Sequence, residues 1–160
     1  MEKQISIENV EMFCMKQNIK LTTRRKEVLV SLLESGKALS AYDLIKILKA
    51  QSGATVPAMS VYRILEFLED NSLVHKLKLT NKYIACSFIN CEHEHGSPQF
   101  LICNDCNSVK EVSVDQETMT ALQSMVKGAG FSLRSSQIEI DCVCSKCNQL
   151  MQADITKMEI

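Results

Sequence analysis

In the first half of the chain, apolar residues recur at helical spacing between clear stop signals. The first such face predicts a helix that ends near Gln17-Asn18, and its apolar members are Ile7, Val10, Phe13 and Cys14. A second helix can be capped by Thr22 or Thr23 and closed by Gly36, with inward positions at Val28, Leu29, Leu32 and Leu33. Two short amphipathic helices therefore open the chain.

Two more helices follow. Ser40 can cap the third, because Asp43 places a carboxylate in the first turn. The apolar stripe of this helix is Leu44, Ile47 and Leu48, and Gln51-Ser52-Gly53 breaks it. The fourth helix starts at or near Pro57 and ends at about Asn71, with Val61, Leu65 and Leu68 on its inner face.

After the fourth helix the apolar period changes from helical to alternating. Residues 73–78 and 83–86 resemble the two strands of a β-hairpin. Helices followed by a hairpin are the outline of a winged helix, whose fourth helix here would enter the DNA major groove. A Thr80-Asn81 turn would place His75 opposite Cys86, with Cβ atoms about 5 Å apart, whereas an Asn81-Lys82 turn would pair His75 with Phe88.

The second half predicts a smaller mixed domain. Strands are expected at residues 100–102, 109–114 and 131–140, with a helix at 116–127, and the sequence from Gln149 gives no clear assignment. The expected class is α+β. The expected organisation is a winged-helix domain at 1–84, a linker at 85–98, an α/β domain at 99–150 and a tail at 151–160.

Composition and charge narrow the class of protein. The 160 residues are 46% apolar and 23% charged, which is typical of a globular protein. Because no apolar run reaches about 18 residues and no signal-peptide core is present, we expect a cytoplasmic protein without a membrane partner. Residues 1–84 carry 13 Lys/Arg and 9 Asp/Glu, a net +4, while residues 85–160 carry 5 and 10, a net −5. The basic half is the better candidate for an anionic polymer.

The strongest chemical pattern is a pair of Cys-x-x-Cys motifs that begin forty-one residues apart. Two such knuckles can form a closed four-thiolate zinc cage, and the residues are Cys103, Cys106, Cys144 and Cys147. The alternatives are an iron–sulfur cluster, a redox dithiol, a disulfide or thiols that bind no metal. A closed cage has no open position for water, so we expect no catalysis and no small-molecule substrate.

A second metal constellation surrounds the hairpin. His75 and Cys86 can chelate zinc if they share a face, and further ligands could come from His93, His95 or Glu111. Taken alone, a strand histidine such as His75 is more often a surface or half-buried residue, and a carboxylate such as Glu111 is most often solvated. Of the remaining cysteines, Cys14 is best read as a core residue, and the roles of Cys91 and Cys142 stay open.

The fourth helix carries candidate DNA contacts at Ser60, Tyr62 and Arg63. An arginine can bind the O6 and N7 atoms of guanine with two hydrogen bonds, which discriminates against other bases by about 1–3 kcal/mol. Arg24 and Arg25, near a helix start, are candidate phosphate partners that position without specifying. The alternative for both is a solvated face, and for Tyr62 it is core packing.

Several motifs in order resemble the ferric uptake regulator superfamily and, within it, the zinc uptake regulator branch. The resemblance covers about residues 8–150 and rests on these stretches: LTTRRKEVL, LSAYDLIKIL, SVYRILEFLEDNSLVHKL, NKYIAC, FLICNDCNSVKE and CSKC. Members are dimeric, metal-responsive repressors with an N-terminal winged helix and a C-terminal α/β dimerisation domain. The resemblance therefore implies a homodimer that binds double-stranded operator DNA.

The resemblance also implies two zinc ions per chain. The four knuckle cysteines would hold a structural ion, and the regulatory ion would be held by His75, Cys86, a linker histidine and Glu111. In this branch the linker histidine usually stands slightly nearer the first knuckle than His95 does here. His95 is the expected ligand, and His93 is the alternative. The thiolate of Cys86 favours zinc over iron. The resemblance also implies that Tyr42 contacts DNA and that Arg63 contacts a purine base.

The expected function is repression of zinc-uptake genes when zinc is ample. One alternative keeps the fold and changes the signal to iron or peroxide. A second, from another class, is a zinc or thiol redox switch without DNA binding, and a third is a zinc ribbon that binds other proteins.

Overall fold

The chain forms two compact units, Met1–His93 and Glu94–Ile160. The computed structural model describes residues 6–87, 89 and 97–158, with side chains as far as Met151. Most of the predicted linker lies outside the described residues, so the predicted bounds of the domains stay a prediction. No helix in the described part of the chain combines the length and apolar character needed to cross a membrane.

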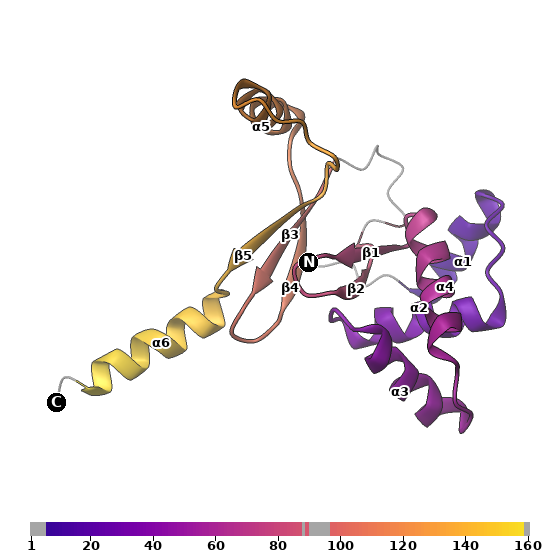
Figure 1. Ribbon diagram of the computed structural model, residues 1–160. Helices are drawn as coiled ribbons and strands as arrows, with labels where there is room; N and C mark the ends of the chain where they lie inside the picture. Colours follow the sequence, from indigo (N-terminus) through magenta and orange to yellow (C-terminus); the bar gives the residue numbers. More distant parts are fainter. Residues whose placement is uncertain (1–5, 88, 90–96, 159–160) are drawn as a thin grey trace. The chain divides into compact units, whose positions relative to one another are not determined.

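Unit 1 begins with four helices (Figure 1). They are α1 (Ile7–Lys16), α2 (Thr23–Ser35), α3 (Ala41–Ser52) and α4 (Ala58–Asp70). Thr22 caps α2, and Gly36 ends it in the left-handed conformation at φ 58°. Ser40 and Asp43 form the predicted capping box of α3. All four predicted helices are confirmed to within a residue or two.

The core of unit 1 gathers one apolar face from each helix. Its fully buried members are Val10, Val28, Leu29, Leu44, Leu48, Val61, Leu65 and Leu68, among others. The predicted inward faces are confirmed, although Leu33 and Ile47 are only half-buried. Cys14 lies in this core at 1% exposure, as expected for a small apolar residue. The packed helices leave the opposite face of α4 in solvent.

The hairpin that completes unit 1 consists of β1 (Val74–Leu77) and β2 (Lys82–Ala85). The winged-helix prediction is confirmed, but the predicted register is wrong. His75 pairs with Ile84, not with Cys86 or Phe88, because the connection is a four-residue turn at 78–81. Asn81 closes that turn at a positive φ of 51°, a conformation that asparagine tolerates better than most residues.

A short bridge ties this wing to the segment before α3. Leu39 and Tyr83 exchange two backbone hydrogen bonds, Leu39 N to Tyr83 O at 2.9 Å and Tyr83 N to Leu39 O at 2.7 Å. β2 is therefore hydrogen-bonded on both edges, to β1 on one and to Leu39 on the other. No local pattern in the chain predicts this bridge.

Unit 2 is built on a three-stranded sheet in the order β4-β3-β5. β3 (Pro98–Cys103) pairs antiparallel with β4 (Val109–Ser113) and parallel with β5 (Ile138–Cys142). The crossover between β4 and β5 contains α5 (Gln116–Gly128), which begins at the N-cap Asp115. The strands predicted at 100–102 and 109–114 and the helix predicted at 116–127 are confirmed to within a few residues.

One prediction for unit 2 is wrong, and one segment had no prediction. The strand expected at 131–140 begins only at Ile138, because residues 131–137 form bends that lead into β5. Ser136 is held there by its carbonyl oxygen, which accepts a hydrogen bond at 3.3 Å from the buried amide of Gln99. Beyond Cys144 the chain forms α6 (Ser145–Met158), where the sequence had given no assignment past Gln149.

Candidate metal centres and the exposed face of α4

The first cysteine knuckle is the turn between β3 and β4. Cys103 ends β3, and its N–H donates to the carbonyl of Ser108 at 2.9 Å while its own carbonyl accepts from Asn107 at 2.9 Å. Asn107 adopts a positive φ of 57°, which lets the chain reverse within a few residues. This tight reversal brings Cys106 back toward Cys103.

The second knuckle lies where β5 passes into α6, with Cys144 before the helix and Cys147 in its first turn. The parallel register places Cys103 opposite Cys142, so both knuckles leave the sheet at the same edge. Hydrogen bonds that join them include Asn104 N to Cys142 O at 3.2 Å and Cys144 N to Cys103 Sγ at 3.3 Å. Pairing of β3 with β5 thus unites motifs far apart in sequence.

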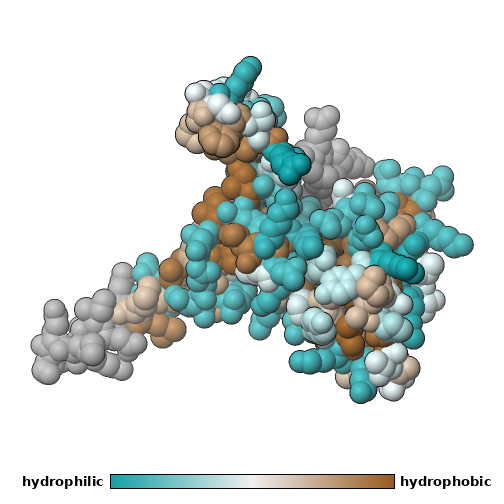
Figure 2. All heavy atoms as spheres, in the orientation of Figure 1, coloured by the Kyte–Doolittle hydropathy of each residue, from teal (hydrophilic) through white to brown (hydrophobic). Residues whose placement is uncertain are grey.

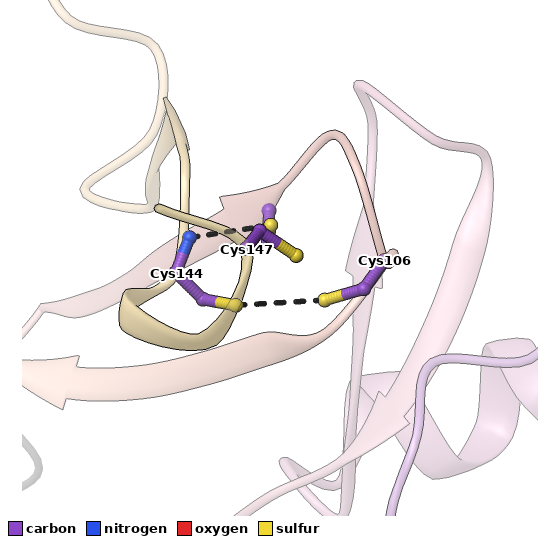
Figure 3. A group of neighbouring side chains, drawn as sticks. Cys106, Cys144 and Cys147 are labelled. Atoms are coloured by element: carbon purple, nitrogen blue, oxygen red, sulfur yellow. Dashed lines mark hydrogen bonds between the residues drawn. The ribbon is translucent and has the colours of Figure 1, made fainter. Parts of the chain in front are cut away.

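The four sulfur atoms of the knuckles lie within 4.8 Å of one another. Figure 3 shows the sulfurs of Cys106 and Cys144 pointing at each other, at a separation of 3.7 Å. A zinc ion bound to thiolates at about 2.3 Å in a tetrahedron separates its sulfurs by about 3.8 Å, whereas a disulfide bond measures about 2.05 Å. All four cysteines are free. The arrangement fits a four-thiolate zinc centre.

The local hydrogen bonds prepare Cys103 to be a thiolate. Backbone N–H groups, first that of Cys144 and then that of Cys106, lower the pKa of Cys103 to about 6. The Cys147 N–H likewise lowers the pKa of Cys144. The pKa of Cys147 is raised, chiefly because its thiol donates to Cys144. The deprotonated sulfurs are the form that binds a metal.

His75 and Cys86 form a second pair of potential ligands, inside unit 1. A ring nitrogen of His75 lies within 4.8 Å of Cys86 Sγ. Cys86 is 4% exposed, and its N–H donates to the Leu73 carbonyl at 3.0 Å. The register differs from the predicted one by two residues, and an even shift keeps a side chain on the same face of a hairpin. The predicted proximity therefore survives the error in pairing.

The other predicted ligands differ in what the structure describes. Glu111 is a half-buried residue of β4, opposite Phe100 of β3. His93, His95 and Cys91 lie outside the described residues. Cys142, half-exposed, donates through Sγ to the Ile140 carbonyl at 3.4 Å, and burial, followed by the charge of Glu11, raises the pKa of the Cys14 thiol. Neither cysteine joins a group of potential ligands among the described residues.

The predicted DNA contacts on helices α3 and α4 are in solvent. Ser60, Tyr62 and Arg63 are exposed on α4, and Tyr42 is 67% exposed in the first turn of α3. Sequence reasoning overlooked Met59 on the same face of α4, which is 65% exposed. The sequence does indicate this residue, because Met59 is apolar but lies outside the buried stripe of Val61, Leu65 and Leu68.

Arg24 and Arg25, the two residues predicted to contact DNA phosphates, both interact with other residues of the protein. Arg24 Nη1 lies 2.9 Å from Glu27 Oε2 on the surface of α2. Arg25 packs on the Phe67 ring and donates from Nη1 to the Lys20 carbonyl at 2.7 Å. Binding to phosphate would have to compete with these contacts, so a phosphate role for either arginine stays a prediction.

Comparison with known protein sequences gives one consistent result. The model of the ferric uptake regulator family matches residues 16–141. A zinc uptake regulation protein of Escherichia coli (strain K12) is 35% identical over 139 residues, which are 86% of this chain and 78% of that protein. A ferric uptake regulation protein of Helicobacter pylori (strain ATCC 700392 / 26695) is 26% identical over 143 residues, 89% of this chain and 91% of that one.

Solved structures agree with the sequences. A zinc uptake regulator complexed with zinc and DNA superposes with a TM-score of 0.77 at 29% identity, covering 91% of this chain and 95% of that one. The crystal structure of holo XcZur gives 0.73 at 31% identity, covering 89% and 96%.

Proposed function

Because the chain belongs to the ferric uptake regulator family, as its motifs predicted, we propose that it is a zinc-responsive transcriptional repressor. It would bind operator DNA as a homodimer when its regulatory zinc is bound, and the repressed genes would be those for zinc uptake. The similarity to a zinc uptake regulation protein and to a zinc uptake regulator holding zinc and DNA supports the choice of signal.

The observation that carries the proposal is the pair of His75 and Cys86 beside the wing. Their donor atoms lie within 4.8 Å of each other, a separation that one metal ion can bridge. Zinc accepts imidazole and thiolate together, and a soft thiolate selects zinc over harder cations. An iron-responsive regulator would have to bind iron through the same thiolate, which suits iron less well than it suits zinc.

The remaining ligands of the regulatory site are proposed to be Glu111 and a linker histidine, His95 or, alternatively, His93. Glu111 belongs to unit 2, whereas His75 and Cys86 belong to unit 1. Ligands from both units holding one ion would restrict the orientation of the winged helix relative to the rest of the chain. Such a restriction would let zinc occupancy control how two recognition helices match a palindromic operator.

The four knuckle cysteines are proposed to hold a second, structural zinc. Structural zinc sites with four thiolates have no open coordination position. Here the sulfurs would join the β3–β4 turn to the start of α6 and so fix the edge of the sheet. No catalytic step belongs to the proposal, because a cage closed by four thiolates would offer neither a position for a reacting water nor a nearby base.

α4 is proposed to read the operator. Its inner residues are packed in the core, whereas Ser60, Tyr62 and Arg63 face solvent. Its N-cap is Pro57, which makes no side-chain capping hydrogen bond. Tyr42, at the exposed start of α3, is the proposed additional contact.

Dimerisation is proposed for unit 2, where large apolar side chains remain in solvent. Figure 2 shows apolar atoms gathered along the sheet and the start of α6. The exposed members are Phe131, Leu133, Ile140, Val143, Leu150 and Met151. β5 is also an edge strand with one side unpaired among the described strands. An apolar surface beside an open strand edge is suited to a second copy of the same unit.

The proposal is tested by zinc analysis together with DNA binding of the wild type and Cys86→Ser. The duplex is one enriched from a random-sequence library by the zinc-loaded wild type. We expect Cys86→Ser to retain about one tightly held zinc per chain at the four-thiolate site and to lose zinc-dependent binding. Since zinc binding and DNA binding must raise each other's affinity by the same factor, the duplex should raise the zinc affinity of the wild type but not that of Cys86→Ser.

Cys142→Ser is the matched control, because its thiol lies outside both ligand sets. It should behave as the wild type in both assays. Activation of DNA binding by ferrous iron and not by zinc would reject the proposed signal. Zinc-independent binding by the wild type would reject the proposed switch, and absence of any enriched duplex would favour the thiol-switch alternative.

A further inference from the structure

The exposed face of α4 carries a large apolar residue, Met59, near its N-terminal end. Val61, Leu65 and Leu68 are fully buried, so the opposite face is the one available to a partner. Met59 lies on that face one turn before Arg63, and residues four apart on a helix are neighbours. Tyr62, three residues from Met59, flanks it on the other side. Met59 therefore stands at the N-terminal end of the candidate DNA-reading residues.

Met59 is a large apolar side chain that the protein itself does not bury. It is 65% exposed, and its chain neighbours Ala58 and Ser60 are small and exposed as well. The core takes its residues from the other side of the helix, so packing of unit 1 gives no reason for a methionine here. Any apolar contact to this exposed side chain would therefore come from a partner.

The charges along α4 decide which end of the helix can approach DNA. Arg63 is the only cation of the helix, and the exposed acids Glu66, Glu69 and Asp70 all follow it. Phosphates repel the acidic half, whereas the N-terminus of a helix carries the positive end of its dipole. The N-terminal residues of recognition helices contact base edges in the known docking geometry. Met59 is the first large side chain at that end.

The major groove offers one apolar group, the 5-methyl of thymine; every other distinguishing group there is a hydrogen-bond donor or acceptor. Methionine is flexible and polarisable and adapts well to such a contact. We propose that Met59 determines specificity by packing on the 5-methyl group of a thymine adjacent to the base read by Arg63. This assignment rests on the proposed function, because it requires α4 to enter the groove.

The test removes one methyl group at a time from the DNA. The duplex enriched by the zinc-loaded full-length protein is resynthesised with deoxyuridine in place of each thymine in turn, which leaves base pairing intact. For one thymine in each half-site, the wild type should lose about fourfold in affinity, the equivalent of one buried methyl group. Met59→Ala should bind the thymine duplex more weakly and show no further loss with deoxyuridine.

Two variants serve as controls. Met59→Leu keeps an apolar side chain and should retain the preference for thymine. Met15→Ala removes a methionine that is 73% exposed on α1 and should bind both duplexes as the wild type does. The salt dependence of affinity should be the same for the wild type and Met59→Ala, because no phosphate contact is changed. Zinc content and circular dichroism verify that Met59→Ala is folded.

The outcomes separate this assignment from the repressor proposal. If the wild type binds its duplex with zinc but tolerates deoxyuridine at every position, the role of Met59 is rejected and the repressor proposal stands. The same holds if Met59→Ala remains as sensitive to deoxyuridine as the wild type. If no duplex is enriched, both proposals are rejected.

Discussion

The guanidinium carbon of Arg25 lies 3.3 Å from the centroid of the Phe67 ring, and this contact joins the start of α2 to the C-terminal part of α4. The same guanidinium donates from Nη1 to the Lys20 carbonyl at 2.7 Å. Arg24, its neighbour, instead forms a surface ion pair with Glu27. Two consecutive arginines with identical chemistry thus have different surroundings.

Replacing Arg25 should cost stability, and replacing Arg24 should not. Arg25→Ala removes both a cation–π contact and a charged hydrogen bond, and we expect the free energy of unfolding to fall by about 2 kcal/mol. Arg24→Ala breaks an exposed ion pair and should cost less than about 1 kcal/mol. Urea denaturation of the zinc-loaded proteins without DNA measures both. Equal losses would mean that the stack on Phe67 contributes nothing.

Loss of one knuckle thiolate should unfold the edge of unit 2. Cys106 is exposed, so Cys106→Ser removes little burial but deletes one of the four proposed zinc ligands. We expect zinc content to fall by about one ion per chain and amide exchange to increase in β3, β5 and α6, since structural zinc contributes directly to folding. Cys142→Ser should leave both readouts unchanged. Full zinc content in Cys106→Ser would remove Cys106 from the ligand set.

The capping box of α3 should give a defined dependence of stability on pH. The Ser40 hydroxyl, and then the Ser40 backbone N–H, lower the pKa of Asp43, which accepts from them at 2.7 and 2.9 Å. A carboxyl group whose pKa is lowered by folding stabilises the protein at pH values above the pKa of the same group in the unfolded chain, which is about 4. That stabilisation is lost as the pH falls through the folded pKa.

Asp43→Asn isolates this charge because asparagine keeps an acceptor oxygen. The difference in free energy of unfolding between the wild type and Asp43→Asn should be constant near neutral pH and should shrink toward zero below about pH 4. Urea denaturation across this range measures it. Because zinc release at low pH affects both proteins alike, a difference that persists in acid would contradict the role of the Asp43 carboxylate.

An acidic residue on β5 should separate the proposed dimer. Ile140 is 44% exposed on this edge strand, and Ile140→Asp would place a charge in the proposed apolar interface. We expect monomers by analytical ultracentrifugation and weaker binding to a two-half-site duplex, since each dimer binds both half-sites. Leu79→Asp, at a 63% exposed position in the wing turn, should remain dimeric. Monomeric wild type would reject the interface altogether.

The helices of unit 1 were predictable because their signals are local. Thr22, Gly36 and Ser40 each act on the helix end beside them, and the apolar spacing marks the buried face. The two Cys-x-x-Cys motifs were equally readable, since each knuckle is a single turn. What brings them together, the parallel pairing of β3 with β5, is a long-range contact that no local signal records.

The errors in the predicted elements arise where the length of a turn or one distant contact decides the result. Residues 78–81 offer several turns of different length, and the sequence does not choose among them; the choice sets the register of His75. The start of β5 at Ile138 depends in part on Gln99 holding the carbonyl of Ser136. The candidate ligand pair was still found, because alternation along the wing survives an even shift of register.

The double hydrogen bond between Leu39 and Tyr83 has a mechanical consequence. Tyr83 stands three residues before Cys86, and Leu39 immediately precedes the Ser40 cap of α3, which carries Tyr42. If Cys86 is displaced, β2 can tilt only if the segment before α3 moves with it or if both hydrogen bonds break together. We therefore expect the wing and the start of α3 to move together, coupled by these two hydrogen bonds.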